Sequence, residues 1–138
     1  MVYCLGQWGV TGKTVFNAKA VAERLERIRP PAAEGLFEYD IAEDGVHIRN
    51  IRWIEEKDGP IKVYKPPQEG RPYVIGGDTA GDGSDWFVGQ VLDNVTGVQA
   101  AVLRHEYDED TYARQMYCLA DGTTTPCWRR RPTFPHTR

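Results

Sequence analysis

Apolar residues recur at helical spacing near the start of the chain. Between Val15 and Ile28 they stand three or four positions apart, and lysine, arginine and glutamate fill most of the positions between them. This spacing gives one apolar face and one charged face, so it predicts an amphipathic helix over 15–28. The run Arg29-Pro30-Pro31 ends the helix, because proline lacks a backbone N–H and restricts the residue before it.

The next segment changes to the pattern of short strands. Apolar and polar residues alternate over 36–39, 46–54 and 61–64, and turn-forming residues at 43–45 and 57–60 separate these runs. We expect a small antiparallel ribbon here, followed by a second proline- and glycine-containing loop over 66–70.

A third block contains the run Tyr73-Val74-Ile75-Gly76-Gly77, which predicts a buried strand that ends directly at Asp78. Two more strands are expected at 86–92 and 98–103, and the polar segment 93–97 between them favours a hairpin turn. The carboxylate of Asp78 is therefore expected at the end of a strand in an antiparallel set of three.

A helix is expected to follow these strands. Asp108, Asp110 or Thr111 is a suitable N-cap, and Tyr112, Met116 and Leu119 recur on one face. From 121 to 138 the pattern is lost, because three prolines and four arginines replace regular apolar spacing. We predict an irregular tail there.

Composition narrows the class of protein. With 138 residues and 41% hydrophobic content, the chain can bury one modest core. The net charge of −3 lacks the basic field usual in nucleic-acid binders, although it divides into −6 over 1–120 and +3 over the tail. Three cysteines without a CxxC pair indicate neither a disulfide framework nor a zinc site, and no stretch is apolar enough to cross a membrane. We expect a soluble protein of a reducing cytosol.

The segment Gly9-Val10-Thr11-Gly12-Lys13-Thr14 is similar to a phosphate-binding P-loop but does not meet its spacing. The first glycine of that motif would have to stand where Gln7 stands, and no strand of useful length precedes it. A junction between a loop and the first helix is the better interpretation.

The densest chemical signal is the run from Asp78 to Asp85, which has carboxylates at Asp78, Asp82 and Asp85. Calcium-binding EF-hand spacing is broken by Ala80 and Gly83. Two interpretations remain, namely a polar turn with incidental acids and a site for a hard divalent cation in which Asp78 is the main ligand.

Two segments together resemble the large terminase subunit of tailed phages. One is Leu5-Gly6-Gln7-Trp8-Gly9-Val10 with Thr14-Val15-Phe16, and the other runs from Tyr73 to Asp85, with the strands at 88–93 and 96–100 adding support. The resemblance covers residues 1–120. It implies an α/β fold, namely a partial ribonuclease H-like mixed sheet that is preceded by a helix and a small antiparallel β ribbon.

The resemblance also implies a division of the chain and an activity. Residues 1–31 would be the end of an ATPase domain with its linker helix, 32–70 the ribbon and linker, and 71–120 the first half of a nuclease domain. That family's nuclease cleaves double-stranded DNA with two Mg²⁺ or Mn²⁺ ions, and Asp78 matches its first metal-binding acid, with Asp82 and Asp85 as weaker candidates. Portal protein and small terminase subunit would be partners, in the cytoplasm of a bacterial host.

Departures from the family lead us to expect a fragment without a complete site. The ATPase motifs and the second and third catalytic acids are not present in this sequence, so we expect weak metal binding and no cleavage by this chain alone. Codons compatible with residues 121–138 can, after a two-base shift behind Leu119, also encode the glycine and tyrosine-asparagine pattern that the family shows there. A frameshift is therefore our hypothesis for the tail.

Two other classes of function stay open at this point. An actin-like or sugar-kinase-like ATPase fragment would also place an aspartate and glycines at the end of a strand, and would bind nucleotide without DNA. A noncatalytic phage-assembly module would instead form a stable, metal-independent complex through the ribbon.

Overall fold

The computed structural model describes residues 15–79 and 86–124, which belong to two units that divide between Pro30 and Pro31. The first unit contains helix α1, Ala18–Glu26, within the range expected from the sequence. Asn17 caps it, because its side-chain oxygen accepts a hydrogen bond from the Ala20 N–H at 3.1 Å. None of the residues of α1 is buried.

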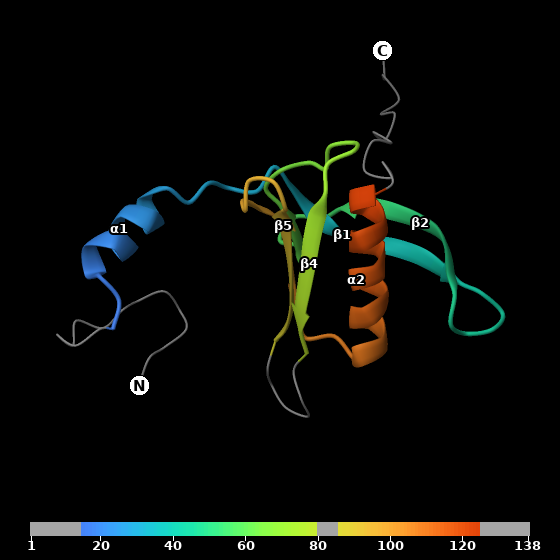
Figure 1. Ribbon diagram of the computed structural model, residues 1–138. Helices are drawn as coiled ribbons and strands as arrows, with labels where there is room; N and C mark the ends of the chain where they lie inside the picture. The colour runs from blue at the N-terminus through green and yellow to red at the C-terminus, as the bar shows by residue number, and fades with distance from the viewer. Residues whose placement is uncertain (1–14, 80–85, 125–138) are drawn as a thin grey trace, which may run out of the picture. The chain divides into compact units, whose positions relative to one another are not determined.

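The second unit is built on a six-stranded sheet (Figure 1). Every strand expected from the sequence is present, with small differences at the ends. The strands are β1 Ala33–Ile41, β2 Ile48–Glu55, β3 Ile61–Val63, β4 Tyr73–Asp78, β5 Phe87–Asp93 and β6 Gln99–His105. Their order across the sheet is β2-β1-β3-β6-β5-β4, and each neighbouring pair is antiparallel.

Strand β3 joins the ribbon strands to the later three strands. It pairs with β1 through Ala33↔Val63 on one side and with β6 through Ile61↔Leu103 on the other. Gly59, in the turn before β3, packs so tightly on β1 that a Cβ there would lie 2.7 Å from the Gly35 Cα. The ribbon and the β4-β5-β6 strands are therefore parts of one continuous sheet.

Helix α2, Glu109–Thr124, follows β6 and packs on one face of the sheet against β1 and β4 (Figure 1). Asp108 is its N-cap, one of the three residues suggested by the sequence, and its Oδ1 accepts from the Thr111 N–H at 2.8 Å. Tyr112 and Leu119 are buried and Met116 is partly buried, as the spacing predicts.

The helix continues into the segment that we expected to be irregular. Residues 121–124 form its last turn, and Gly122 is buried there, although glycine and threonine have weak helix propensity. Residues 125–138, including Arg129-Arg130-Arg131, lie outside the described residues, and the frameshift hypothesis is untested.

The core lies between α2 and the covered face of the sheet. Fully buried side chains on both sides, such as Leu103 and Leu119, each stabilise the fold by roughly 1.5–3 kcal/mol relative to exposure. The buried apolar residues are Phe37, Ile61, Val63, Phe87, Val91, Ala100, Ala101, Leu103, Tyr112, Cys118 and Leu119.

The α/β class is confirmed, although the described sheet is antiparallel throughout rather than mixed. A parallel pairing would need a strand after α2, and the residues after Thr124 lie outside the described part of the chain.

Candidate functional site

Asp78 is the last residue of β4, and it is exposed. It lies opposite Val88 of β5, at the end of the strand from which the chain enters the 80–85 segment. The strand itself was expected to be buried, and this is wrong. Strand β4 is at the edge of the described sheet, and its residues alternate between half-buried and exposed up to Ile75, because α2 covers one face only.

Two glycines let α2 approach the end of β4 closely. A Cβ on Gly77 would overlap the Tyr112 hydroxyl. A Cβ on Gly89, the residue of β5 that pairs with Gly77, would overlap the Met116 sulfur. Glycine inside a strand pattern is a known mark of close approach, so the sequence did contain a signal for this contact. These positions bring the side chains of α2 next to the strand that carries Asp78.

Tyr112 connects α2 to that strand end. Its hydroxyl donates a hydrogen bond to the Val88 carbonyl at 2.8 Å, and Val88 is the residue paired with Asp78. Burial raises the pKa of Tyr112, the negative charge of Asp78 raises it further, and a hydrogen bond with the Asp78 backbone acts in the opposite sense. Tyr112 is therefore a protonated hydrogen-bond donor at neutral pH that fixes the backbone next to the candidate ligand.

The other two candidate ligands, Asp82 and Asp85, lie outside the described residues. Within 15–79 and 86–124, no three His, Cys, Asp or Glu side chains are grouped as a metal site would require. Asp78 is thus a single exposed carboxylate, which suits one ligand of a hard cation and cannot by itself hold two ions.

Arg104 and Trp86 lie on the sheet face opposite α2, which is also the face of Asp78. Arg104 of β6 is paired with Val88, and its guanidinium carbon lies 4.2 Å from the centre of the Trp86 ring. Sequence spacing did not identify Arg104 as a neighbour of Asp78, because their relation depends on the register of three strands.

The histidines have local roles or lie outside the described part. His47 interacts with Asp44 in the β1–β2 turn, where hydrogen bonds from the His47 side chain and from the turn backbone lower the pKa of Asp44 to about 2. The His105 ring stacks on Tyr107 at 3.9 Å, and burial raises the pKa of Tyr107 to about 12. His136 is not among the described residues.

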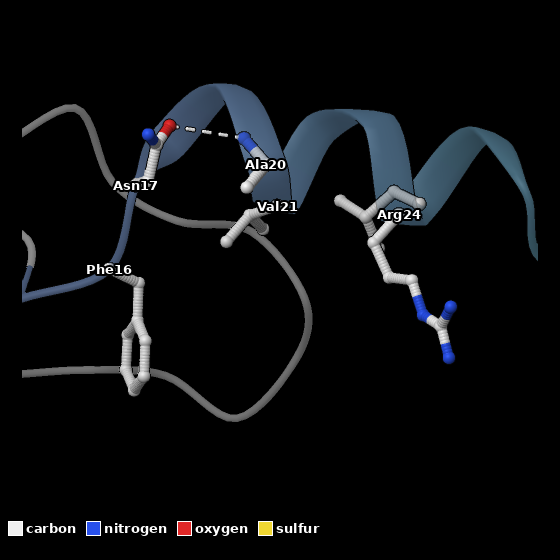
Figure 2. A pocket seen from close by; sticks show the side chains of 6 residues that line it. Phe16, Asn17, Ala20, Val21 and Arg24 are labelled. Atoms are coloured by element: carbon white, nitrogen blue, oxygen red, sulfur yellow. Dashed lines mark hydrogen bonds between the residues drawn. The ribbon is translucent and has the colours of Figure 1, made fainter.

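A shallow pocket lies against α1 in the first unit (Figure 2). Apolar side chains, among them Phe16 and Val21, line it, and Arg24 is the charged residue beside them. Among the described residues, its lining contains no carboxylate, histidine or cysteine. The P-loop-like segment 9–14 and the first segment of the terminase resemblance, before Val15, lie outside the described residues.

Comparisons of the chain with protein-family models, with curated proteins and with solved structures find no match. None of the helices in the described part of the chain is long and apolar enough to cross a membrane.

Proposed function

We propose that this chain is part of a phage terminase large subunit, and that its sheet is the first half of a metal-dependent DNA nuclease domain. One observation carries the proposal. Three consecutive antiparallel strands are followed by a helix on one face, and the first of these strands ends in an exposed carboxylate, Asp78. The terminase resemblance predicts this order of elements and this position of the acid.

Asp78 suits the role of a metal ligand in its chemistry and its surroundings. Its exposed carboxylate offers hard oxygen donors, and none of the ion pairs among the described residues uses it. Tyr112 fixes the neighbouring backbone through Val88 and leaves the carboxylate accessible. Asp82 or Asp85 would assist as a further ligand.

In the intact protein, bound Mg²⁺ or Mn²⁺ would activate water and stabilise the leaving oxygen of a phosphodiester. Asp78 would hold and orient such an ion at the strand end, and further acids would come from elements beyond those described. Two cations about 3.5–4 Å apart need several bridging carboxylates, so one strand end cannot hold both. We therefore propose that this chain alone binds metal weakly and does not cleave DNA.

The same proposal assigns double-stranded DNA as substrate, portal protein and small terminase subunit as partners, and the cytoplasm of a bacterial host as the location. Each of these belongs to the intact subunit and rests on the resemblance.

Manganese-dependent nicking of supercoiled plasmid tests the proposal. Two proteins are compared, namely this chain and a version whose frame is restored after Leu119 and continued through the downstream domain. We expect nicking by the extended protein, its loss in Asp78→Asn, and its retention in Glu55→Gln. Glu55 is a matched control, because it is the exposed last residue of β2, the other edge strand of the described sheet.

Nicking by the extended protein that persists in Asp78→Asn would overturn the assignment of the site. Absence of nicking, combined with saturable ATP binding by the same protein, would favour the ATPase alternative instead. Nicking by this chain alone would contradict the incomplete site.

A further inference from the structure

The strand register places an arginine in line with Asp78. Asp78 pairs with Val88, and Val88 pairs with Arg104, so the three residues form one row across β4, β5 and β6. Directly paired residues point their side chains to the same face of a sheet. Two strand spacings separate the ends of the row, which puts the Asp78 and Arg104 backbones about 10 Å apart.

This row lies on the face opposite α2. Gly77 and Gly89, which alternate with Asp78 and Val88, are the positions beneath Tyr112 and Met116. On the face away from α2, which is the face of the row, Gln90 and Arg104 are exposed and Leu92 is 39% exposed. A ligand approaching this face would therefore meet the row directly, at least over the described residues.

Arg104 is an exposed arginine that could bind an anion. Its guanidinium carbon lies 4.2 Å from the centre of the Trp86 ring, which is itself 46% exposed. This cation–π contact restrains the guanidinium on the open face. Two other arginines of the sheet unit, Arg52 and Arg71, form ion pairs with acids, whereas none of the ion pairs within the described residues includes Arg104. Lys62, one row away on the same face, is paired with Glu34 at 3.5 Å.

We propose that Arg104, oriented by Trp86, binds a backbone phosphate of the DNA strand that passes over Asp78. The proposal rests on the function proposed above and adds a positioning residue to it. A planar guanidinium recognises a phosphodiester by paired hydrogen bonds. Arg104 holds the strand on the open face, while the acid at the end of β4 lies beside it.

Binding without cleavage isolates this contact. Fluorescence anisotropy of a short labelled DNA oligonucleotide, at low salt in EDTA, is measured with the full chain and its variants. We expect Arg104→Gln to weaken binding about three- to tenfold and to lower the slope of log K against log salt by about one. Arg104→Lys keeps the charge and should keep the slope, and Trp86→Leu should weaken binding in the same direction as Arg104→Gln.

Arg49→Gln is the matched control, because Arg49 is an exposed arginine on β2, at the far edge of the same sheet. Each variant is first checked by thermal melting, so that loss of the fold is not taken for loss of a contact. Equal binding by Arg104→Gln and the unmodified chain, or an equal loss in Arg49→Gln, would overturn the proposal. Absence of binding by the unmodified chain would overturn it as well.

The two proposals fail in different ways. Unchanged binding in Arg104→Gln, together with Asp78-dependent nicking by the extended protein, would remove the phosphate contact and keep the nuclease. Weakened binding in Arg104→Gln, together with nicking that does not depend on Asp78, would keep a nucleic-acid contact and remove the proposed metal site.

Discussion

Two consecutive glycines of β4, Gly76 and Gly77, differ in the space that surrounds them. A Cβ on Gly76 would have no heavy atom within 4 Å, whereas a Cβ on Gly77 would overlap the Tyr112 hydroxyl. We predict that Gly77→Ala lowers the free energy of unfolding by about 1–3 kcal/mol, because the helix or the strand must move. Gly76→Ala should leave it unchanged or raise it by up to about 1 kcal/mol. Urea denaturation of both variants measures the difference.

The same contact can be tested by a double-mutant cycle. Tyr112→Phe removes the hydroxyl and its hydrogen bond to Val88, at a cost of about 1 kcal/mol. In that background Gly77→Ala should cost less than in the native chain, because the overlapping atom is gone. Additive effects of the two substitutions would show that Tyr112 does not hold α2 against the end of β4.

Asp93 has an unusual environment for a residue in a hairpin. It is buried, and its carboxylate accepts hydrogen bonds from the Arg71 guanidinium. The carboxylate also accepts hydrogen bonds from the backbone N–H groups of Val95 and Thr96. Hydrogen bonding to Arg71 is the largest cause that holds its pKa well below the usual range. A depressed carboxyl pKa stabilises the fold above the unfolded value of about 3.9, and this stability is lost as the pH falls through the folded value.

We therefore predict that the melting temperature falls when the pH is lowered from about 5 to about 2, and that Asp93→Asn makes this fall smaller. The variant should also melt lower than the native chain near pH 7, since it loses the charged partner of Arg71. Thermal melts followed by circular dichroism across this range measure both effects. Glu55→Gln is the control, and an acid-induced fall of the same size in Asp93→Asn as in the native chain would contradict the prediction.

At the scale of elements, the Gln115 side chain of α2 takes the place of strand hydrogen bonds beside β1. The pairing of β1 with β3 ends at Gly35, and two residues further along Phe37 uses its backbone N–H and C=O to bond the buried Gln115 side chain of α2, at 3.1 and 2.7 Å. The helix thereby continues the hydrogen bonding of β1 where β3 is too short to do so. This explains why a polar side chain is 3% exposed in an otherwise apolar interface.

Replacing Gln115 should therefore be costly. We predict that Gln115→Leu lowers the free energy of unfolding by about 2–4 kcal/mol, because the Phe37 backbone loses two buried hydrogen bonds. Gln90→Leu, on the exposed face of β5, should cost less than about 1 kcal/mol. Equal effects in chemical denaturation would show that the Gln115 bonds contribute little.

Local pattern was enough to predict the elements, because the strands are short apolar or alternating runs between turn-forming residues and each helix has an apolar face. It also predicted that Asp78 ends a strand, and Asp108 was one of three residues that it offered as the N-cap of the last helix. Pattern did not predict what depends on pairing between distant segments. The edge position of β4, the link from β3 to β6, the helical turn at 121–124 and the row from Asp78 to Arg104 all follow from the register and from what α2 covers.

At the scale of the whole molecule, α2 determines where the sheet can grow. It follows β6, crosses the covered face and contacts β4, the edge strand (Figure 1). A strand that returns after such a crossover runs parallel to the strand before the helix. Because β6 and β4 are separated by two antiparallel pairings, they run in the same direction. The next strand of the proposed nuclease would therefore pair with the free edge of β4 and make the sheet mixed.

From this geometry we expect the edge of β4 to be a site of self-association in the present chain. Its backbone faces no partner strand among the described residues, Val74 is 48% exposed, and no charge lies along it before Asp78. We predict concentration-dependent association in analytical ultracentrifugation, and its reduction by Val74→Lys, since a lysine on an edge strand opposes pairing with another copy. Val46→Lys, at a 73% exposed position in the β1–β2 turn, should not change it. The frame-restored protein should be monomeric, because its added strand would occupy the edge. Association that persists equally in Val74→Lys and in the frame-restored protein would place the contact elsewhere and remove this argument for a missing parallel strand.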